Sequence, residues 1–405
     1  MSSSTQPRVP AATWLSRWAS LAIVVLAMAT LGIAAMVPIY SDEIAMQMVR
    51  ARFFIEGGAL LNLLPQCRAL QTFIPISWYP GAVFNSILYP GARHLGLRPR
   101  GTGVCAAWLS LLWTWAGLHP QTLVPRRSFQ ASVLSLNMLG VLPFVLVLAR
   151  SEQLLVLALI VYCVLALFWK VETSDGVSRK CLKAAVLFLV TSAFLVAHPK
   201  ALFFAPVMLV STWLVFRDSG KPWMIGALLA TGFAIFESVQ YVLFTTSCPG
   251  APAMAKVLAQ HTLDFQLLAA DKSLFLEAAF RNLAASLGLV LDRVPATLAY
   301  QSNWLPSVRG EWMEPLLGGF GKLLKVSLYV LALLTVIAVI ARLAVQLSRK
   351  RLDEALILAV ALLAGLVLHG VVYNSNAWHF YTPGLIVPML VGLLMLVLST
   401  PPVAP

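Results

Sequence analysis

Long apolar stretches alternate with short charged segments along most of the chain. An apolar stretch of about twenty residues is long enough for an α-helix to cross the roughly 30 Å hydrocarbon core of a bilayer. The pattern predicts ten such spans. Their expected bounds are 18–40, 102–118, 128–149, 153–170, 182–198, 200–217, 222–244, 323–345, 353–373 and 380–400.

The segment 71–95 has two interpretations. Its sequence, QTFIPISWYPGAVFNSILYPGARHL, is largely apolar but contains three prolines and is interrupted by Asn85 and Ser86. It is either an eleventh span or a helix lying at the interface. Basic residues gather in cytoplasmic loops, and the interfacial interpretation places Arg126, Arg127 and the cluster 349–351 on the inner side. We therefore favour an interfacial segment.

This topology has two large loops on the outer face. The first is 41–100, and the second is 245–322. Within the second loop, 254–272 and 273–291 have the apolar spacing of amphipathic helices. The first span is expected to stay uncleaved with its N-terminus inside, because its apolar run is too long for a signal-peptide core.

Composition places the chain in the membrane class. Of its 405 residues, 60% are hydrophobic and 11% are charged, against about 25% charged residues in soluble domains. The fold class predicted is an all-α polytopic membrane protein with about ten transmembrane helices and outer-face juxtamembrane helices. We expect one domain, 1–400, with a tail at 401–405. The net charge of +13 is explained by cytoplasmic loops and anionic lipid, so no nucleic-acid partner is expected.

Polar side chains gather at the outer face in this topology. Polar groups within or at the edge of a bilayer are costly and often functional. The segment IYSDEIAMQMVRARFF opens the first loop with an acidic pair and a basic pair directly after a span. The polar residues of the outer face are Asp42, Glu43, Arg50, Arg52, Arg150, Glu152, His198, Lys200, Glu237, Gln240, His369, Asn374, Asn376, Trp378, His379 and Tyr381.

The turn AHPKAL in mid-chain joins two short apolar runs. The runs 184–197 and 201–216 would extend only about 21–24 Å as α-helices. Pro199 breaks the helix at this point. The turn is therefore expected to lie below the outer surface, where charge is tolerated if it lines a cavity.

Each of these residues also has a structural interpretation. Asp42 can cap a helix together with Ser41, Arg150 can extend towards the lipid headgroups, and Glu237 can pair with a nearby base. Trp78 and Tyr79 suit an interfacial aromatic belt. The two outer cysteines, Cys67 and Cys248, either form a disulfide or are unrelated thiols. The chain lacks a phosphate-binding glycine loop, a GxSxG motif and a paired CxxC motif, and its histidines do not form a metal site.

Several of these motifs, taken in order, resemble the GT-C superfamily of integral-membrane glycosyltransferases. They are the acidic pair after the first span, the segment PISWYPG, the turn HPKAL and the late turn HFYTPGLIVP. The nearest likeness is to the protein O-mannosyltransferase and lipid A aminoarabinose transferase branches. The late turn departs from the family, because His379 and Phe380 stand where many members have Arg and Tyr.

The resemblance implies a transferase that takes a sugar from a polyprenyl-phosphate carrier and gives it to an acceptor on the outer face of the cytoplasmic membrane. The acceptor would be lipid-linked, glycan or protein. Asp42 would be the base, and Glu43 would orient it or bind the acceptor. The phosphate would be bound by Arg50, Arg52, Lys200 and, more weakly, Arg150. Substrate contacts are expected from Trp78, Tyr79, His198, Glu237, His379 and Tyr381.

Some expectations remain open at this stage. Some GT-C branches hold a divalent cation at the acidic pair, whereas others need no cofactor. A transporter or flippase of lipid-linked glycans is a second hypothesis, but transporters place charges at mid-bilayer, often with internal repeats, and no repeat is visible. A glycan polymerase is a third; it would be expected to have an Arg-rich late loop, whereas 245–322 contains only Arg281, Arg293 and Arg309.

Overall fold

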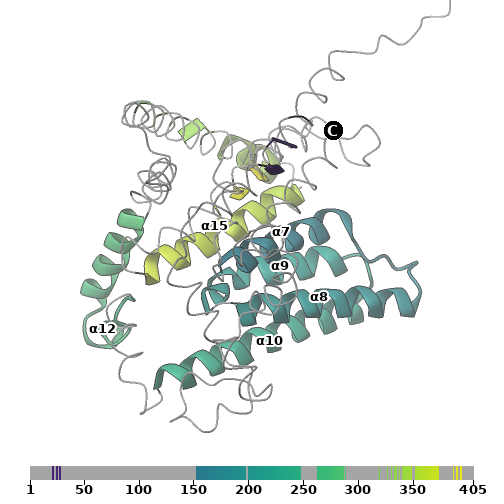
Figure 1. The fold of residues 1–405 in the computed structure, drawn as a ribbon, viewed down its shortest axis with the longest axis horizontal. Coiled ribbons are helices and arrows are strands. Elements are labelled where there is room, and N and C mark those ends of the chain that lie inside the picture. Colours follow the sequence, from purple (N-terminus) through teal and green to yellow (C-terminus); the bar gives the residue numbers. More distant parts are fainter. Residues whose placement is uncertain are drawn as a thin grey trace, which may run out of the picture.

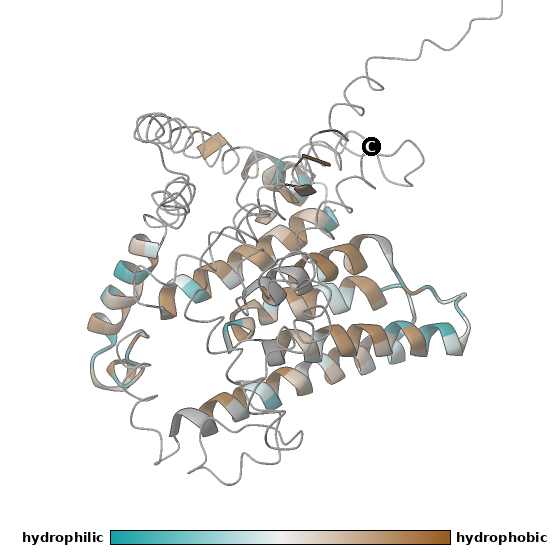
Figure 2. Ribbon diagram, viewed as in Figure 1, coloured by the Kyte–Doolittle hydropathy of each residue, from teal (hydrophilic) through white to brown (hydrophobic). Residues whose placement is uncertain are grey.

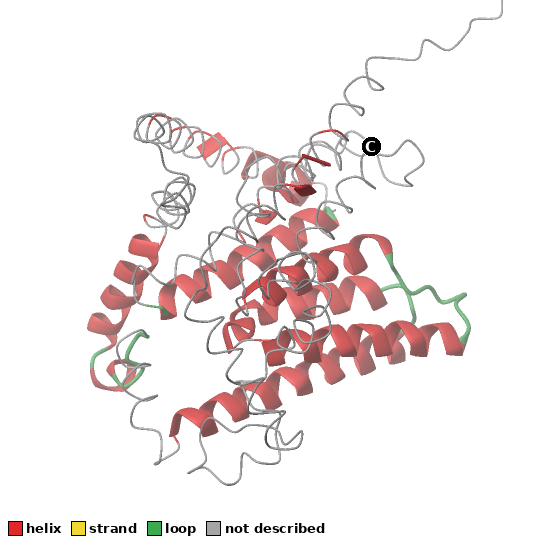
Figure 3. Ribbon diagram, in the orientation of Figure 1, coloured by secondary structure: helices red, strands yellow, loops and turns green. Residues whose placement is uncertain are grey.

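The computed structural model is all-helical in the residues that it describes. These are 152–197, 199–247, 262–286, 340–348 and 352–373, together with isolated positions within 21–28, at 288, and within 319–337 and 386–394. Within these residues there is no strand, only an isolated antiparallel bridge between Thr262 and Tyr373. Figure 3 shows the helices in red and their connections in green.

Five consecutive elements form the best-defined part of the fold. They are α7 (Glu152–Phe168), α8 (Val177–Ala197), the 3-10 helix η2 (Pro199–Phe204), α9 (Ala205–Phe216) and α10 (Lys221–Ser247). A later helix, α15 (Glu354–Val372), packs against α9, η2 and α7. Figure 1 shows these elements side by side. The short connections make α7, α8, α9 and α10 alternate in direction.

The alternation gives the bundle two ends. The C-termini of α7 and α9 and the N-termini of α8, α10 and α15 meet at one end, which we call the Asp175 end after the loop residue Asp175. The 3-10 helix η2 and the C-terminus of α15 lie at the other, which we call the Lys200 end. Hydrophilic residues gather in the α7–α8 connection and at the start of α8, whereas the bodies of the helices are hydrophobic (Figure 2).

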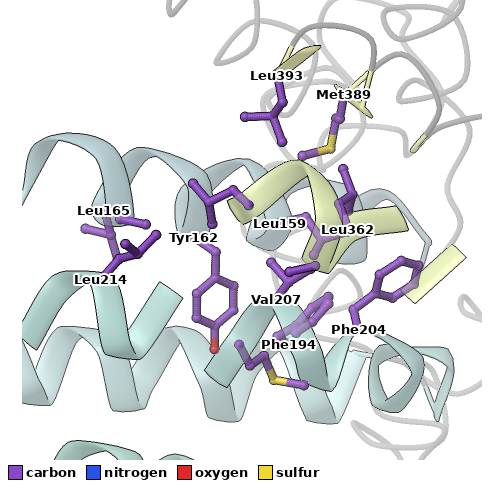
Figure 4. Packing of buried hydrophobic residues seen from close by; sticks show 14 of the residues in the cluster. Leu159, Tyr162, Leu165, Phe194, Phe204, Val207, Leu214, Leu362, Met389 and Leu393 are labelled. Carbon is purple, nitrogen blue, oxygen red and sulfur yellow. The ribbon is translucent and has the colours of Figure 1, made fainter. Parts of the chain in front are cut away.

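A continuous apolar core joins these helices. Leu159 and Tyr162 of α7, Phe194 of α8, Val207 of α9 and Leu362 of α15 are all fully buried and belong to one cluster (Figure 4). Tyr162 and Phe194 meet edge to face with ring centroids 5.9 Å apart. The Tyr162 hydroxyl lies 2.5 Å from Thr191 Oγ1, so its polar group is satisfied inside the core.

The predicted last span also contributes to this core. The described residues Ile386, Met389, Leu393 and Leu394 are helical and buried against it. Their spacing of three, four and one residues places them on one face of a helix. By contrast, the described helical positions within the predicted spans 18–40 and 323–345 include exposed apolar residues, among them Val25 and Ile337.

The described helices coincide, apart from their ends, with the predicted spans 153–170, 182–198, 200–217, 222–244 and 353–373. The predicted segments 71–95, 102–118 and 128–149 lie outside the described residues. Helix α8 begins at Val177, five residues before the predicted start, because its first turns carry charged residues that extend the helix beyond the apolar run. The predicted span 200–217 is divided into η2 and α9. At 2.0 Å per residue for η2 and 1.5 Å for α9, the two together are roughly 30 Å long, so the segment is longer than its apolar run alone suggested.

Among the described residues, two helices are long and apolar enough to cross a membrane by themselves. They are the segment Lys221–Gln240 of α10 and the whole of α15. Ala158–Leu167 and Lys200–Phe216 are apolar but shorter. These findings support membrane association.

Buried lysines connect the loops at the Asp175 end. Lys183, which is only 3% exposed, donates to the carbonyl of Lys170 at 2.5 Å and to Asp175 at 3.0 Å. Lys180 donates to the carbonyls of Thr173 and Ser219 at 3.1 and 3.2 Å. Both ammonium groups thus satisfy carbonyls that follow the ends of α7 and α9, where a positive charge is favourable.

Candidate functional site

The Lys200 end contains a buried charge beside an aromatic cluster. Lys200 is only 4% exposed and is the second residue of η2, directly after Pro199. Its ammonium nitrogen lies 5.5 Å from the centroid of the Tyr373 ring, within the range of a cation–π interaction. Because Pro199 fixes its own backbone φ, it suits the position at which the chain leaves α8 and starts a tight new helix.

Tyr373 is one of three rings that contact one another. Phe203 contacts His369 and Tyr373 edge to face, with centroids 5.6 Å apart in both cases. His369 and Tyr373 stack at 4.8 Å with 24° between their planes. They are four residues apart, so the geometry of α15 places them one above the other.

The imidazole of His369 lies in the last turn of α15 and is almost fully buried. A basic side chain is favoured at a helix C-terminus by the helix dipole. The backbone N–H of Tyr373 closes the helix by donating to the His369 carbonyl at 3.0 Å. The end of α15 therefore presents an imidazole, a phenol ring and, from η2, an ammonium group in one place.

The segment 262–286 closes one side of this cluster. Leu263 donates its backbone N–H to the carbonyl of Val372 at 2.7 Å, and Asn282 donates its side-chain amide to the carbonyl of Val371 at 3.2 Å. Thr262 forms the isolated bridge with Tyr373. Carbonyl groups at the end of α15, which lack partners within the helix, are thus satisfied by this segment.

The local sequence explains why 262–286 folds in this way. Asp264 accepts from the N–H of Gln266 at 2.8 Å and so forms a turn before α12 (Leu267–Ala270). Asp271 accepts from the N–H groups of Ser273 and Leu274 at 2.9 and 3.0 Å and so caps the helix 272–286. Residues 267–270 and 272–286 are thus helical, within the stretches 254–272 and 273–291 for which helices were predicted.

Such a cluster is suited to bind an anion. A buried ammonium loses most of its hydration, so a phosphate or carboxylate that replaces the lost water is bound strongly. The Tyr373 ring next to Lys200 favours a cation there. An imidazole adjacent to the anion can supply a further hydrogen bond in either protonation state.

Of the twelve residues predicted to form the site, the structure describes Lys200 and Glu237. Lys200 is buried as described above. The side chain of Glu237 is exposed on α10, between the exposed residues Phe236 and Gln240 of the same helix, rather than buried with Lys200. The other ten lie outside the described residues, and they are Asp42, Glu43, Arg50, Arg52, Trp78, Tyr79, Arg150, His198, His379 and Tyr381.

Sequence reasoning did not identify Phe203 or Tyr373. Both are aromatic residues beside a turn that had been singled out for other residues: Phe203 follows HPK, and Tyr373 precedes NSN. The sequence feature that could have identified them is an aromatic residue within three positions of a predicted polar turn. His369 was noted as a polar residue in the outer half of its span, and the structure places it in the cluster.

The described residues contain no group of three or more His, Cys, Asp or Glu side chains that could hold a metal ion. The acidic pair at which a cation was considered lies outside them, as do Cys67 and Cys248. Cys163 and Cys181 are free thiols.

Comparisons with known proteins leave the family open. No family model, no curated protein and no solved structure matches this chain.

Proposed function

We propose that this chain is a membrane glycosyltransferase of about ten spans that uses a polyprenyl-phosphate sugar as donor. The Lys200 end would face the periplasm or cell exterior and hold the active site. Supporting this orientation, the basic residues Lys170, Arg179, Lys180 and Lys183 gather at the opposite end, as expected of a cytoplasmic face.

The observation that carries the proposal is the burial of Lys200 against Tyr373 and the 5.5 Å contact between them. An ammonium buried at the end of membrane helices can bind a phosphate through charge-assisted hydrogen bonds, which are stronger where water is excluded. A lipid phosphate in the outer leaflet would lie at the depth of Lys200. Lys200 would therefore stabilise the phosphate leaving group, as charge-assisted hydrogen bonds do.

The reaction would be a single in-line displacement. The acceptor hydroxyl oxygen forms a bond to the anomeric carbon, while the bond from that carbon to the phosphate oxygen breaks and its electron pair leaves with the phosphate. Asp42 would take the hydroxyl proton as general base, and Glu43 would orient it. One displacement inverts the anomeric centre, and a phosphate leaving group needs no separate acid, unlike the leaving group of an inverting hydrolase.

The remaining roles follow from the resemblance. Arg50 and Arg52 would share the donor phosphate with Lys200, and Arg150 would contribute more weakly. The aromatic residues Trp78 and Tyr79 would contact the sugar or the lipid. His198, Glu237, His379 and Tyr381 would complete the substrate contacts.

The test is a turnover assay on purified protein in nanodiscs with a panel of short-chain polyprenyl-phosphate sugars. Lys200→Gln is expected to lower turnover at least tenfold, because it removes the ammonium that stabilises the leaving group. Lys272→Gln, which changes an exposed lysine near the same end, serves as the control and should retain wild-type turnover. Normal turnover in Lys200→Gln would contradict the assigned role.

The main alternative is a transporter or flippase of lipid-linked glycans. An exposed Glu237 within the apolar helix α10 is the observation that favours it, because carboxylates in spans often belong to transport pathways. A wild-type protein that binds a donor and moves it across a liposome membrane without cleaving it would establish this alternative. A polymerase would instead lengthen a lipid-linked glycan in the same assay.

A further inference from the structure

The segment 262–286 is fixed to the end of a helix that can cross a membrane. Its backbone and side chains bond the carbonyls of Val371 and Val372, the last two residues of α15. Gly370 allows close packing, since a Cβ at that position would lie 2.9 Å from Cδ1 of Leu283. The segment therefore lies level with the end of α15, as Figure 1 shows for α12 and the helix that follows it.

The helix 272–286 has an apolar side and a polar side. Ala279 is buried and Leu283 is half-buried on the packed face. Glu277 and Arg281 form an ion pair at 3.4 Å on an exposed face. Leu276 and Phe280 are four residues apart, next to the packed face, and are 66% and 73% exposed. Since successive residues are about 100° apart, Phe280 and Arg281 point in clearly different directions.

Neighbouring elements also expose apolar side chains. Phe265 and Leu268, in and before α12, are 57% and 47% exposed. Helix α15 itself exposes Val360, Leu363 and Val367, which lie three and four residues apart on one side, as expected of a helix in contact with acyl chains. The exposed apolar side of α15 thus extends towards the end on which 262–286 is fixed.

We propose that 262–286 is a membrane-interface segment whose partner is the lipid leaflet at the end of α15. Leu276 and Phe280 insert at the boundary between acyl chains and headgroups, while Glu277 and Arg281 remain in water. Amphipathic helices that lie in the interface have this division of faces. The inference does not depend on the glycosyltransferase activity.

The segment 262–286 lies beside the Lys200 cluster because both contact Tyr373. Tyr373 pairs with Thr262 of the segment on one side and contacts Lys200 on the other. A segment lying in the interface therefore fixes the depth of Lys200 relative to the lipid headgroups. A molecule carried on a lipid phosphate in the same leaflet would meet Lys200 without leaving the membrane plane.

Site-directed spin labelling tests the proposal. The full chain, with its five native cysteines replaced by serine, receives one nitroxide through Phe280→Cys or through Arg281→Cys. Each protein is placed in nanodiscs, and collision rates with oxygen and with a water-soluble nickel chelate are measured. We expect the label at 280 to favour oxygen and the label at 281 to favour nickel, with ratios that differ severalfold.

Two results would overturn the proposal. A label at 280 that collides with nickel as often as the label at 281 would show that this face is in water. A label at 280 that is inaccessible to both reagents would show that protein covers it. A second pair, Leu276→Cys and Glu277→Cys, samples the same two faces one turn earlier and decides the outcome if either of the first variants fails to fold.

Discussion

Gly365 of α15 lies directly against the ring of Phe204 in η2. A methyl group in place of its hydrogen would approach Cε1 of that ring to 2.9 Å and the carbonyl oxygen of Phe203 to 3.1 Å. The absence of a side chain at one position of α15 therefore sets how closely that helix approaches η2, and so how closely His369 and Tyr373 approach Lys200.

Gly365→Ala is expected to lower the free energy of unfolding by about 1–3 kcal/mol, the usual effect of overpacking. The Phe204 ring and the backbone of Phe203 must shift to admit the methyl group. Thermal unfolding in detergent measures the effect. Gly226→Ala in α10 is the matched control, because a Cβ at Gly226 has open space within 4 Å and alanine favours a helix. Equal melting temperatures for the two variants would contradict the close contact.

A charged group at the Asp175 end joins three helices. Glu354, the first residue of α15, accepts from Lys170 after α7 and from Arg217 after α9, the latter at 2.8 Å. Glu354→Gln should destabilise the protein by about 1–2 kcal/mol, because partly buried charge-assisted bonds are worth more than exposed ones. Glu277→Gln is the control, since its exposed pair with Arg281 is worth well under 1 kcal/mol. Thermal unfolding of both variants measures the two effects, and equal melting temperatures would contradict the role of Glu354.

The loop before α8 makes stability depend on pH. The backbone N–H of Glu172 and the ammonium of Lys183 both donate to Asp175 at 3.0 Å and hold the pKa of its carboxyl group below the ordinary value. A carboxyl group with a lowered pKa in the folded state stabilises the protein above its unfolded pKa of about 3.9. That contribution is lost as pH falls through the lower, folded pKa.

The Asp175→Asn variant should therefore melt below wild type at neutral pH, and the difference should shrink as the pH falls below about 4. Melting temperatures measured from pH 7 to pH 3 give the comparison. Asp218→Asn removes an exposed carboxylate and should change the melting temperature little at any pH. A difference between Asp175→Asn and wild type that stays constant with pH would show that the charge of Asp175 does not matter.

Two substitutions of Tyr373 distinguish the contribution of its ring to the site from that of its hydroxyl group. Tyr373→Phe keeps the ring 5.5 Å from the ammonium and should retain donor turnover. Tyr373→Leu removes the ring and should lower turnover by several-fold, since cation–π contacts are worth about 0.5–2 kcal/mol. An equal loss of turnover in Tyr373→Phe and Tyr373→Leu would contradict a role for the ring and would indicate that the hydroxyl acts at this site.

The sequence predicted the helices better than it predicted their ends. The apolar runs that correspond to α7, α10 and α15 were placed within a few residues. The apolar pattern places the start of α8 too late, because Lys180 looks like a loop residue until the carbonyls that it bonds are seen. Helical periodicity also does not distinguish α from 3-10 geometry over six residues, so η2 was not predicted.

Sequence reasoning found the charge of the site but not its surroundings. The sequence indicates Lys200 because it follows Pro199 at a turn between short apolar runs. The contacts of Lys200 depend on Tyr373, which lies 173 positions later and reaches it only through the packing of α15 against η2. Contacts of this kind arise from tertiary structure and cannot be predicted from a hydropathy pattern.

The most direct test of the proposed function is the turnover of Asp42→Asn. Wild-type and variant protein are compared for binding and transfer with a panel of short-chain polyprenyl-phosphate sugars. The account predicts that wild type transfers or slowly hydrolyses one donor, while Asp42→Asn binds the same donor and does not turn it over. Normal turnover by Asp42→Asn, or no donor binding by either protein, would contradict the account and favour a transporter.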